Sequence, residues 1–353
     1  MNREAVLAAI AEERFIEDTD LSGINLDGAD LAGGWFERVN FTGASLKGAD
    51  ISRTGFSDCD FTAADFSSLH MEGGLWRGIR APSAILRDLN FERMIVMDCY
   101  FPDGDFTGSR LYLCNMQNCD LSRSRWQGVN LSRNVFQKAD LRGADFDGAN
   151  LTQAIFNDCV MDGSTRLRGA VLNRTSLIKT AFPGYDFSGL SLEFVQFMSS
   201  DLRGARFQDA KLEGVNFHEA LLAQADFSGV KARQCLFTKA VLHGTILRGG
   251  VFHACMFMEA DMTSADLSGS DFSDAMMEKA ILAGVNSEGA LFFRTDFSHA
   301  SLQDGMFNRA NFDSANLHQT NLDGALLDSA EMRLARRTDP DRFDSENWRR
   351  KEK

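Results

Sequence analysis

Large apolar residues recur at every fifth position along nearly the whole chain, and this period constrains the fold more than any other feature. These central positions run from Ile16 to Met161 and, after one extra residue near Ser164, from Leu167 to Met332. Of the 64 centres, three lack a large apolar side chain: Ala81, Ala232 and Ser287. A period of five fits neither the turn of an α-helix nor the two-residue repeat of a strand, so it indicates a solenoid of stacked coils.

Small residues form a second ladder, two positions before each centre. All seven cysteines stand on it: Cys59, Cys99, Cys114, Cys119, Cys159, Cys235 and Cys255. Because a free cysteine behaves as a small buried hydrophobe, we expect these residues to fill the core rather than to bind metal or form disulfides. That role fits a reducing cytoplasm.

Units such as Ala139-Asp140-Leu141-Arg142-Gly143 resemble the A(D/N)LxG consensus of the pentapeptide repeat family. The resemblance covers residues 14–334. It implies an all-β fold, a right-handed quadrilateral parallel β-helix in which four pentapeptides make one coil. It also implies that the centres and the small residues before them point inward and that the other three positions face solvent. The 64 centres then predict about 16 coils with short terminal caps.

The limits of the repeat predict three parts. Residues 1–15, with Val6, Leu7 and Ile10 at helical spacing, are expected to form an N-terminal capping helix. Residues 16–334 are expected to form a single pentapeptide-repeat β-helix with a one-residue insertion near Ser164. Residues 335–353, where the period stops and Arg336 and Arg337 follow, are predicted to be a charged tail or cap.

Composition and motifs argue against several classes of function. A net charge of −13 does not suit direct nucleic-acid binding, and no run of about 18 apolar residues predicts membrane insertion. We find no signal peptide, so we expect a cytoplasmic protein or one exported by a signal-peptide-independent secretion system. The six histidines are scattered over positions expected to face outward, without metal-ligand spacing, and no phosphate loop or nucleophile elbow occurs. We therefore predict no catalytic, cofactor-binding or metal-binding residues and no enzymatic activity.

One face of the predicted coil is unusually apolar. With four pentapeptides per coil, every fourth pentapeptide returns to the same face, and we name faces A to D by their first centres, Ile16, Leu21, Leu26 and Leu31. The outward position before each centre is usually Asp or Asn in this family, yet on face A nine of 16 are large and apolar. Exposed apolar surface of this extent usually marks an interaction site. With Phe15 at its start, this stripe gives the predicted partner-binding residues: Trp35, Leu75, Ile95, Val135, Ile155, Leu236, Met256 and Met276.

Two classes of partner follow from this sequence. The first is a protein that docks on face A, or a second copy of the chain; the protein is then a bacterial interaction rod, a scaffold or a secretion-associated adaptor or effector. The alternative comes from the resemblance, because the best-known activity of the family is to bind DNA gyrase by imitating duplex DNA. Face B is the most acidic, and its candidate residues for that role are Asp20, Asp60, Asp120 and Asp140.

One stretch departs from the family pattern. Leu69, Ile79, Leu89 and Met94 replace small residues of the second ladder. Either the coil widens there or a ridge projects, and as a hypothesis residues 69–97 form a recognition feature.

Overall fold

The chain forms a parallel β-solenoid, seen in a computed structural model that describes residues 1–348. The predicted all-β class is confirmed. Contacts divide the chain into two compact units, Met1–Ala181 and Phe182–Lys353, which we call the N-terminal and the C-terminal unit. Both carry the five-residue period; the single β-helix over residues 16–334 stays a prediction.

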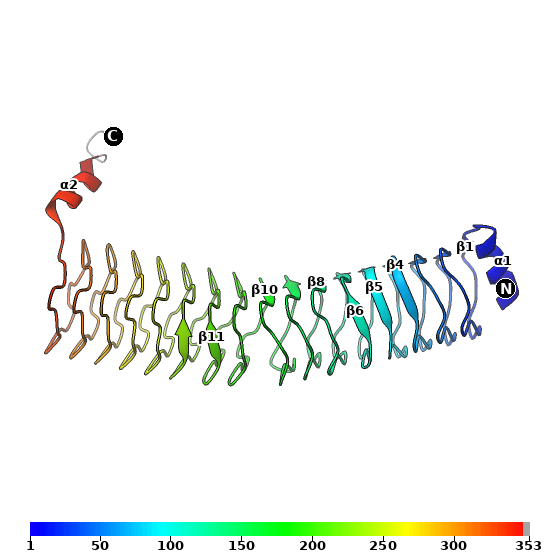
Figure 1. Ribbon diagram of the computed structural model, residues 1–353, viewed down its shortest axis with the longest axis horizontal. Coiled ribbons are helices and arrows are strands. Elements are labelled where there is room, and N and C mark those ends of the chain that lie inside the picture. The colour runs from blue at the N-terminus through cyan, green and yellow to red at the C-terminus, as the bar shows by residue number, and fades with distance from the viewer. Residues whose placement is uncertain (349–353) are drawn as a thin grey trace. The chain divides into compact units, whose positions relative to one another are not determined.

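The regular elements are short and lie mainly in the N-terminal unit (Figure 1). That unit contains α1 (Arg3–Ala11), β1 (Ile16–Glu17), β2 (Trp35–Glu37), β3 (Gly55–Ser57), β4 (His70–Arg77), β5 (Asn90–Met97), β6 (Arg110–Tyr112), β7 (Asn115–Gln117), β8 (Val135–Gln137), β9 (Ile155–Asn157) and β10 (Ser176–Ile178). These strands form one parallel sheet, in which β6 pairs only with β5 and the others follow chain order. The C-terminal unit contains β11 (Lys211–Glu213), which pairs with β12 (Lys231–Arg233), and α2 (Pro340–Trp348).

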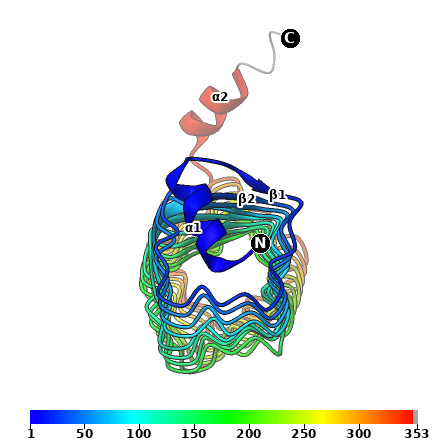
Figure 2. The same ribbon diagram turned by 90° about the vertical axis from the view of Figure 1, so that its right-hand side faces the viewer.

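Backbone pairing joins residues one coil apart. Phe36 of β2 pairs with Phe56 of β3, which is four pentapeptides further along the chain. The three other faces are joined mainly by isolated parallel bridges such as Asp20–Asn40, Asn25–Ser45 and Asp30–Asp50. Each coil of the N-terminal unit therefore has four sides, as Figure 2 shows end-on. Regular strands mark about 11 turns, fewer than the 16 coils expected, because many faces hold an isolated bridge instead of a strand.

Local chemistry explains the consensus of each unit. In the unit around Leu141, the Asp140 carboxylate accepts a hydrogen bond from the Arg142 amide at 3.1 Å and so fixes the corner. Gly143 follows with φ +69°, a left-handed conformation that glycine adopts without strain. Ala139 and Leu141 are fully buried. The sequence pattern therefore builds the corner and the core at the same time.

The core is a set of side-chain columns parallel to the stacking direction. The rings of Phe237 and Phe257 lie 4.6 Å apart and nearly parallel, which matches the strand spacing of about 4.8 Å. All seven cysteines are free and buried, as expected. Burial raises the pKa of Cys59 to about 11 and that of Cys159 to about 12, so these thiols stay protonated.

The extra residue near Ser164 is absorbed at one corner. The Asp162 carboxylate accepts hydrogen bonds from the amides of Ser164 at 2.9 Å and Gly143 at 3.3 Å, which closes the longer loop. The register of the bridges then shifts by a single position: Arg125 pairs with Asp145, but Asp145 pairs with Arg166. The centres on either side stay buried, so the insertion does not disturb the core.

The irregular stretch at residues 69–97 lies mostly in two long strands, β4 and β5, which pair in register. Leu69, Ile79, Leu89 and Met94 are all buried. The large residues of the second ladder therefore point into the core and do not project as a ridge.

Helix α1 lies within the predicted N-terminal segment and covers the first coil. Val6 and Ala9 are buried, and the Arg3 guanidinium donates hydrogen bonds to the carbonyl oxygens of Asn25 at 3.2 Å and Asp27 at 3.0 Å. The buried side chains of α1 cover apolar groups of the first coil, and Arg3 pairs with two of its carbonyl oxygens. The end of the solenoid would otherwise expose these groups. In the C-terminal segment, α2 falls within the predicted tail or cap, and residues 349–353 of that segment lie outside the described residues.

Candidate protein-binding surface

The N-terminal unit brings five of the predicted partner-binding residues onto one ladder of face A. They lie on β2, β4, β5, β8 and β9: Trp35, Leu75, Ile95, Val135 and Ile155. Leu75 pairs directly with Ile95, and Val135 with Ile155, while Gly55 and Asn115 separate these rungs. Ile95 and Ile155 expose 46% and 40% of their surface, and the other three are half-buried.

An aromatic pair begins this ladder. The ring centroids of Phe15 and Trp35 lie 6.2 Å apart in an edge-on arrangement. Trp35 packs over Gly55 in the next coil, where a Cβ atom would come within 2.3 Å of the indole ring. The indole therefore lies against the sheet and is half-buried, whereas Phe15 is exposed.

The C-terminal unit holds the other three predicted residues on consecutive rungs. Leu236 bridges to Met256, and Met256 to Met276. Met276 is 38% exposed and the other two are half-buried. Asp296 and Asn316 follow on the same ladder, so the apolar stripe ends at Met276.

Apolar exposure is not confined to face A. Ile85 and Val171 are exposed in the N-terminal unit, and Met306 and Leu326 occupy adjacent rungs of face C in the C-terminal unit. What distinguishes face A is continuity, since the stripe of the C-terminal unit runs over three rungs where face C has two.

Each of the acidic residues predicted on face B stabilises the turn in which it lies. Each accepts a hydrogen bond from the amide two residues later, at 3.0 Å from Ser22, 2.8 Å from Thr62, 2.9 Å from Ser122 and 3.1 Å from Arg142. Asp120 and Asp140 occupy adjacent rungs, whereas Arg80 and Tyr100 separate Asp60 from Asp120.

Hydrogen bonding keeps two of these carboxylates charged. The Ser22 amide and hydroxyl lower the pKa of Asp20. The Arg142 side chain lowers the pKa of Asp140 and forms an ion pair with it. The acidic ladder of face B is therefore interrupted, and its charge at Asp140 is partly neutralised.

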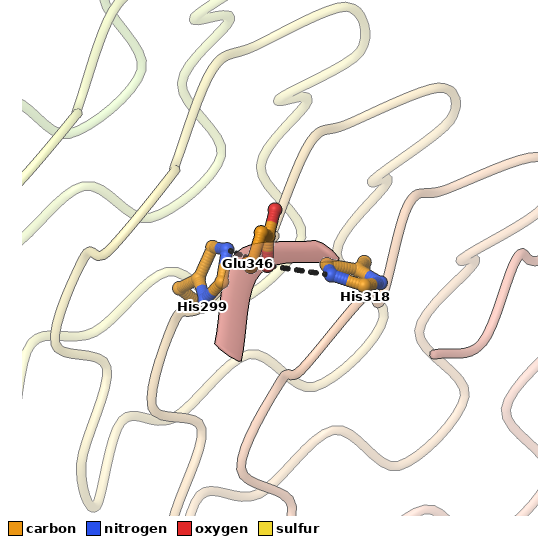
Figure 3. A group of neighbouring side chains, drawn as sticks. All are labelled: His299, His318 and Glu346. Atoms are coloured by element: carbon orange, nitrogen blue, oxygen red, sulfur yellow. Dashed lines mark hydrogen bonds and ion pairs between the residues drawn. The ribbon is translucent and has the colours of Figure 1, made fainter. Parts of the chain in front are cut away.

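The C-terminal unit contains a cluster that sequence spacing did not predict. His299 and His318 lie on successive coils of face A, and both point their Nε2 atoms at one oxygen of Glu346 from α2, at 3.3 and 3.1 Å (Figure 3). His318 stands at one of the repeat positions expected to face outward, yet it is buried because α2 contacts it. The two histidines could have been placed together from the period, but Glu346 follows the end of the repeat.

Two imidazoles and a carboxylate are a donor set that zinc can use, yet the hydrogen bonds here oppose it. The Asp339 amide donates to Nδ1 of His318 at 3.1 Å, so the neutral ring carries its proton on Nε2 and donates it to Glu346. Arg342 and Gln319 also donate to the Glu346 carboxylate, each at 2.7 Å. The cluster is therefore a hydrogen-bonded attachment of α2 to the last coils, and His318 offers no lone pair at Nε2.

No helix among residues 1–348 is long and apolar enough to cross a membrane.

Comparison with known proteins identifies the repeat. The family model described as pentapeptide repeats matches residues 19–75, 114–153 and 165–336 in overlapping segments. The chain matches no curated protein sequence.

Solved structures with a similar repeat include HetL of the cyanobacterium Nostoc, a protein involved in heterocyst differentiation regulation, at 20% identity over 94% of each chain with a TM-score of 0.14. They also include QnrB1, a plasmid-mediated fluoroquinolone resistance protein, at 17% identity over 74% of this chain and 90% of that chain with a TM-score of 0.20. Likeness at these levels carries no argument about activity or partner.

Proposed function

The chain belongs to the pentapeptide repeat family, and from this premise we propose that it is a non-enzymatic protein-binding solenoid whose working surface is the apolar stripe of face A. One observation carries the proposal. Leu236, Met256 and Met276 occupy three consecutive rungs where the repeat usually places Asp or Asn. Leu236 and Met256 are half-buried and Met276 is exposed, and contiguous apolar surface that reaches solvent usually serves an interaction.

The chemistry of the other reactive side chains supports a binding role. The cysteines are free and buried, and the face B carboxylates already accept hydrogen bonds from the amides of their own turns. Among the described residues, His299 and His318 already contact the Glu346 carboxylate of α2. A scaffold and a secretion-associated adaptor or effector would both use such a surface, and the identity of the bound protein distinguishes them.

Affinity capture from bacterial lysate with mass spectrometry tests the proposal. One variant carries Leu75→Asn, Ile95→Asn and Ile155→Asn, and a second carries Leu236→Ser, Met256→Ser and Met276→Ser. The control carries Ile85→Asn, Val171→Asn and Leu291→Ser, exposed apolar residues of other faces. A protein, or a second copy of the chain, that binds wild type and control but neither face A variant supports the proposal. Equal binding by all four chains would contradict it.

A second candidate function is a DNA-mimicking binder of gyrase. The supporting observation is that Asp120 and Asp140 lie on adjacent rungs of face B, with the pKa of Asp140 lowered by its hydrogen bonds to Arg142. This activity predicts inhibition or protection of gyrase supercoiling at micromolar protein, lost when Asp60, Asp120 and Asp140 become Asn. Supercoiling that is unchanged by the wild-type protein would remove this candidate.

A further inference from the structure

A cavity lies in the C-terminal unit between the last coil and the start of α2. Its volume is about 470 Å³, and three of its seven lining residues are arginines, Arg336, Arg337 and Arg342. The position follows from the repeat. Arg337 stands five positions after the last centre, where a further central residue would be expected, and a guanidinium does not enter an apolar column. The coil therefore ends there, with two adjacent arginines at its edge.

The charges around this cavity are not balanced. Arg342 is paired with Glu346 at 2.7 Å. Arg336 and Arg337 are exposed and form no ion pair within residues 1–348. The lining carboxylate, Asp339, accepts hydrogen bonds from the amides of Asp341 at 3.0 Å and Arg342 at 3.1 Å, which caps the helix. The first amides of α2 are thus already used, and the positive charge of the cavity comes from the arginine side chains.

Hydrogen bonds fix the walls of the cavity before any ligand arrives. Arg336 is held on the last coil, since its carbonyl accepts a hydrogen bond from the Leu317 amide at 2.7 Å. The opposite wall is held by the contact of the Asp339 amide with His318 and by that of Thr338 Oγ1, which accepts from the Gln319 amide at 3.1 Å. Glu346 anchors the helix behind it. Binding would therefore require little ordering of the backbone.

We propose that this cavity binds a phosphate monoester dianion through Arg336 and Arg337. The planar guanidinium presents paired N–H donors that match phosphate oxygens, and it stays charged at all accessible pH values. A cavity of this size accommodates a phosphorylated small molecule. The site is separate from the apolar stripe of face A, so the two proposals stand independently.

Isothermal titration of the full chain with inorganic phosphate and with O-phosphoserine, at constant ionic strength, tests the assignment. The variant Arg336→Ala with Arg337→Ala should weaken binding by at least about tenfold. The matched control, Arg333→Ala, removes an exposed arginine of the same coil that does not line the cavity, and should bind as wild type. Tighter binding of O-phosphoserine than of inorganic phosphate would identify the ester as the ligand, and equal binding would identify the free phosphate group.

Two further variants distinguish the loss of the phosphate-binding donors from a loss of folding. Arg336→Lys with Arg337→Lys keeps the charge but removes the paired donors, and it should still weaken binding. Glu346→Gln leaves the two arginines in place but loosens α2, and it should weaken binding less than the double alanine variant. Absence of binding by the wild type at millimolar phosphate, or equal loss in Arg333→Ala, would overturn the proposal.

Discussion

At the residue scale, the left-handed position two residues after each centre limits which side chains the corner tolerates. Most such positions hold glycine or a short or flexible polar residue with φ near +60°. Gly74 lies one residue further along, on the small-residue ladder two positions before Trp76, and it is more restricted, because its φ is +132° and a Cβ atom would lie 2.7 Å from the carbonyl oxygen of Thr54. This conformation is almost restricted to glycine.

Gly74→Ala should therefore lower the free energy of unfolding by about 2–4 kcal/mol, because it adds a backbone clash to conformational strain. Gly128→Ala is the matched control in the same unit, since its φ is +68° and a Cβ atom there meets nothing within 4 Å. We expect that change to cost about 1 kcal/mol. Urea unfolding of both variants checks the difference, and equal midpoints would refute the steric argument.

Replacing either of two buried serines with alanine should change the free energy of unfolding in opposite directions. Ser287 replaces a large apolar centre, and its hydroxyl is buried without a hydrogen-bond partner. Ser270 is equally buried, but its hydroxyl donates to the carbonyl oxygen of Leu247 at 2.7 Å. Ser287→Ala should raise the free energy of unfolding by about 1 kcal/mol, and Ser270→Ala should lower it by a similar amount. Thermal unfolding measured on the two single variants checks the sign, and a stabilised Ser270→Ala would contradict this account.

At the element scale, α2 depends on one carboxylate. Arg342 and His318 lower the pKa of Glu346 from 4.5 to about 2 by hydrogen bonding to the charged form. A carboxylate whose pKa is lower in the folded state stabilises that state above its ordinary pKa. This contribution is lost as the pH falls through the lowered value. Attachment of α2 should therefore hold at neutral pH and weaken toward pH 2.

Hydrogen exchange of the α2 amides between pH 6 and pH 2, corrected for intrinsic rates, measures this attachment. Protection should fall from about pH 4 downward in the wild type, whereas Glu346→Gln should show low protection throughout and no such step. Amides of the core around Phe237 provide the internal reference, since their protection reports the coils rather than the helix. A wild-type α2 that keeps full protection at pH 2 would show that other contacts hold it.

The two terminal helices also differ in how much of their position could be predicted from the sequence. α1 was predictable, because Val6 and Ile10 at helical spacing precede the first centre and give the helix an apolar side. The attachment of α2 was not, because Glu346, His299 and His318 form it through polar contacts between segments without a common period. Spacing identifies an apolar face, but it carries no information about which distant polar groups meet.

At the scale of the whole molecule, the apolar stripes lie in two separate compact units. If both stripes contact one partner, each triple substitution should weaken binding by about tenfold or more, and the combined variant should lose more than either alone, because two linked contacts add through effective concentration. Biolayer interferometry with the captured partner measures the three affinities. A stripe whose triple variant binds as wild type is not part of the interface.

The sequence by itself determined which side chains of the repeat lie inside. Each pentapeptide pairs with the pentapeptide four units further along the chain, so the environment of a repeat residue depends on its place in the period and on its neighbours in adjacent coils. That is why the buried cysteines and the stripe residues Leu236, Met256 and Met276 could be placed from spacing.

The tertiary structure decided what the period does not encode. It placed the large residues of 69–97 inside, laid Trp35 over Gly55, and buried His318 under α2. It also formed the arginine-lined cavity at the end of the last coil. Each of these outcomes depends on the shape of a particular side chain or on a segment beyond the repeat, where packing and hydrogen bonding between specific groups, not periodicity, select the arrangement.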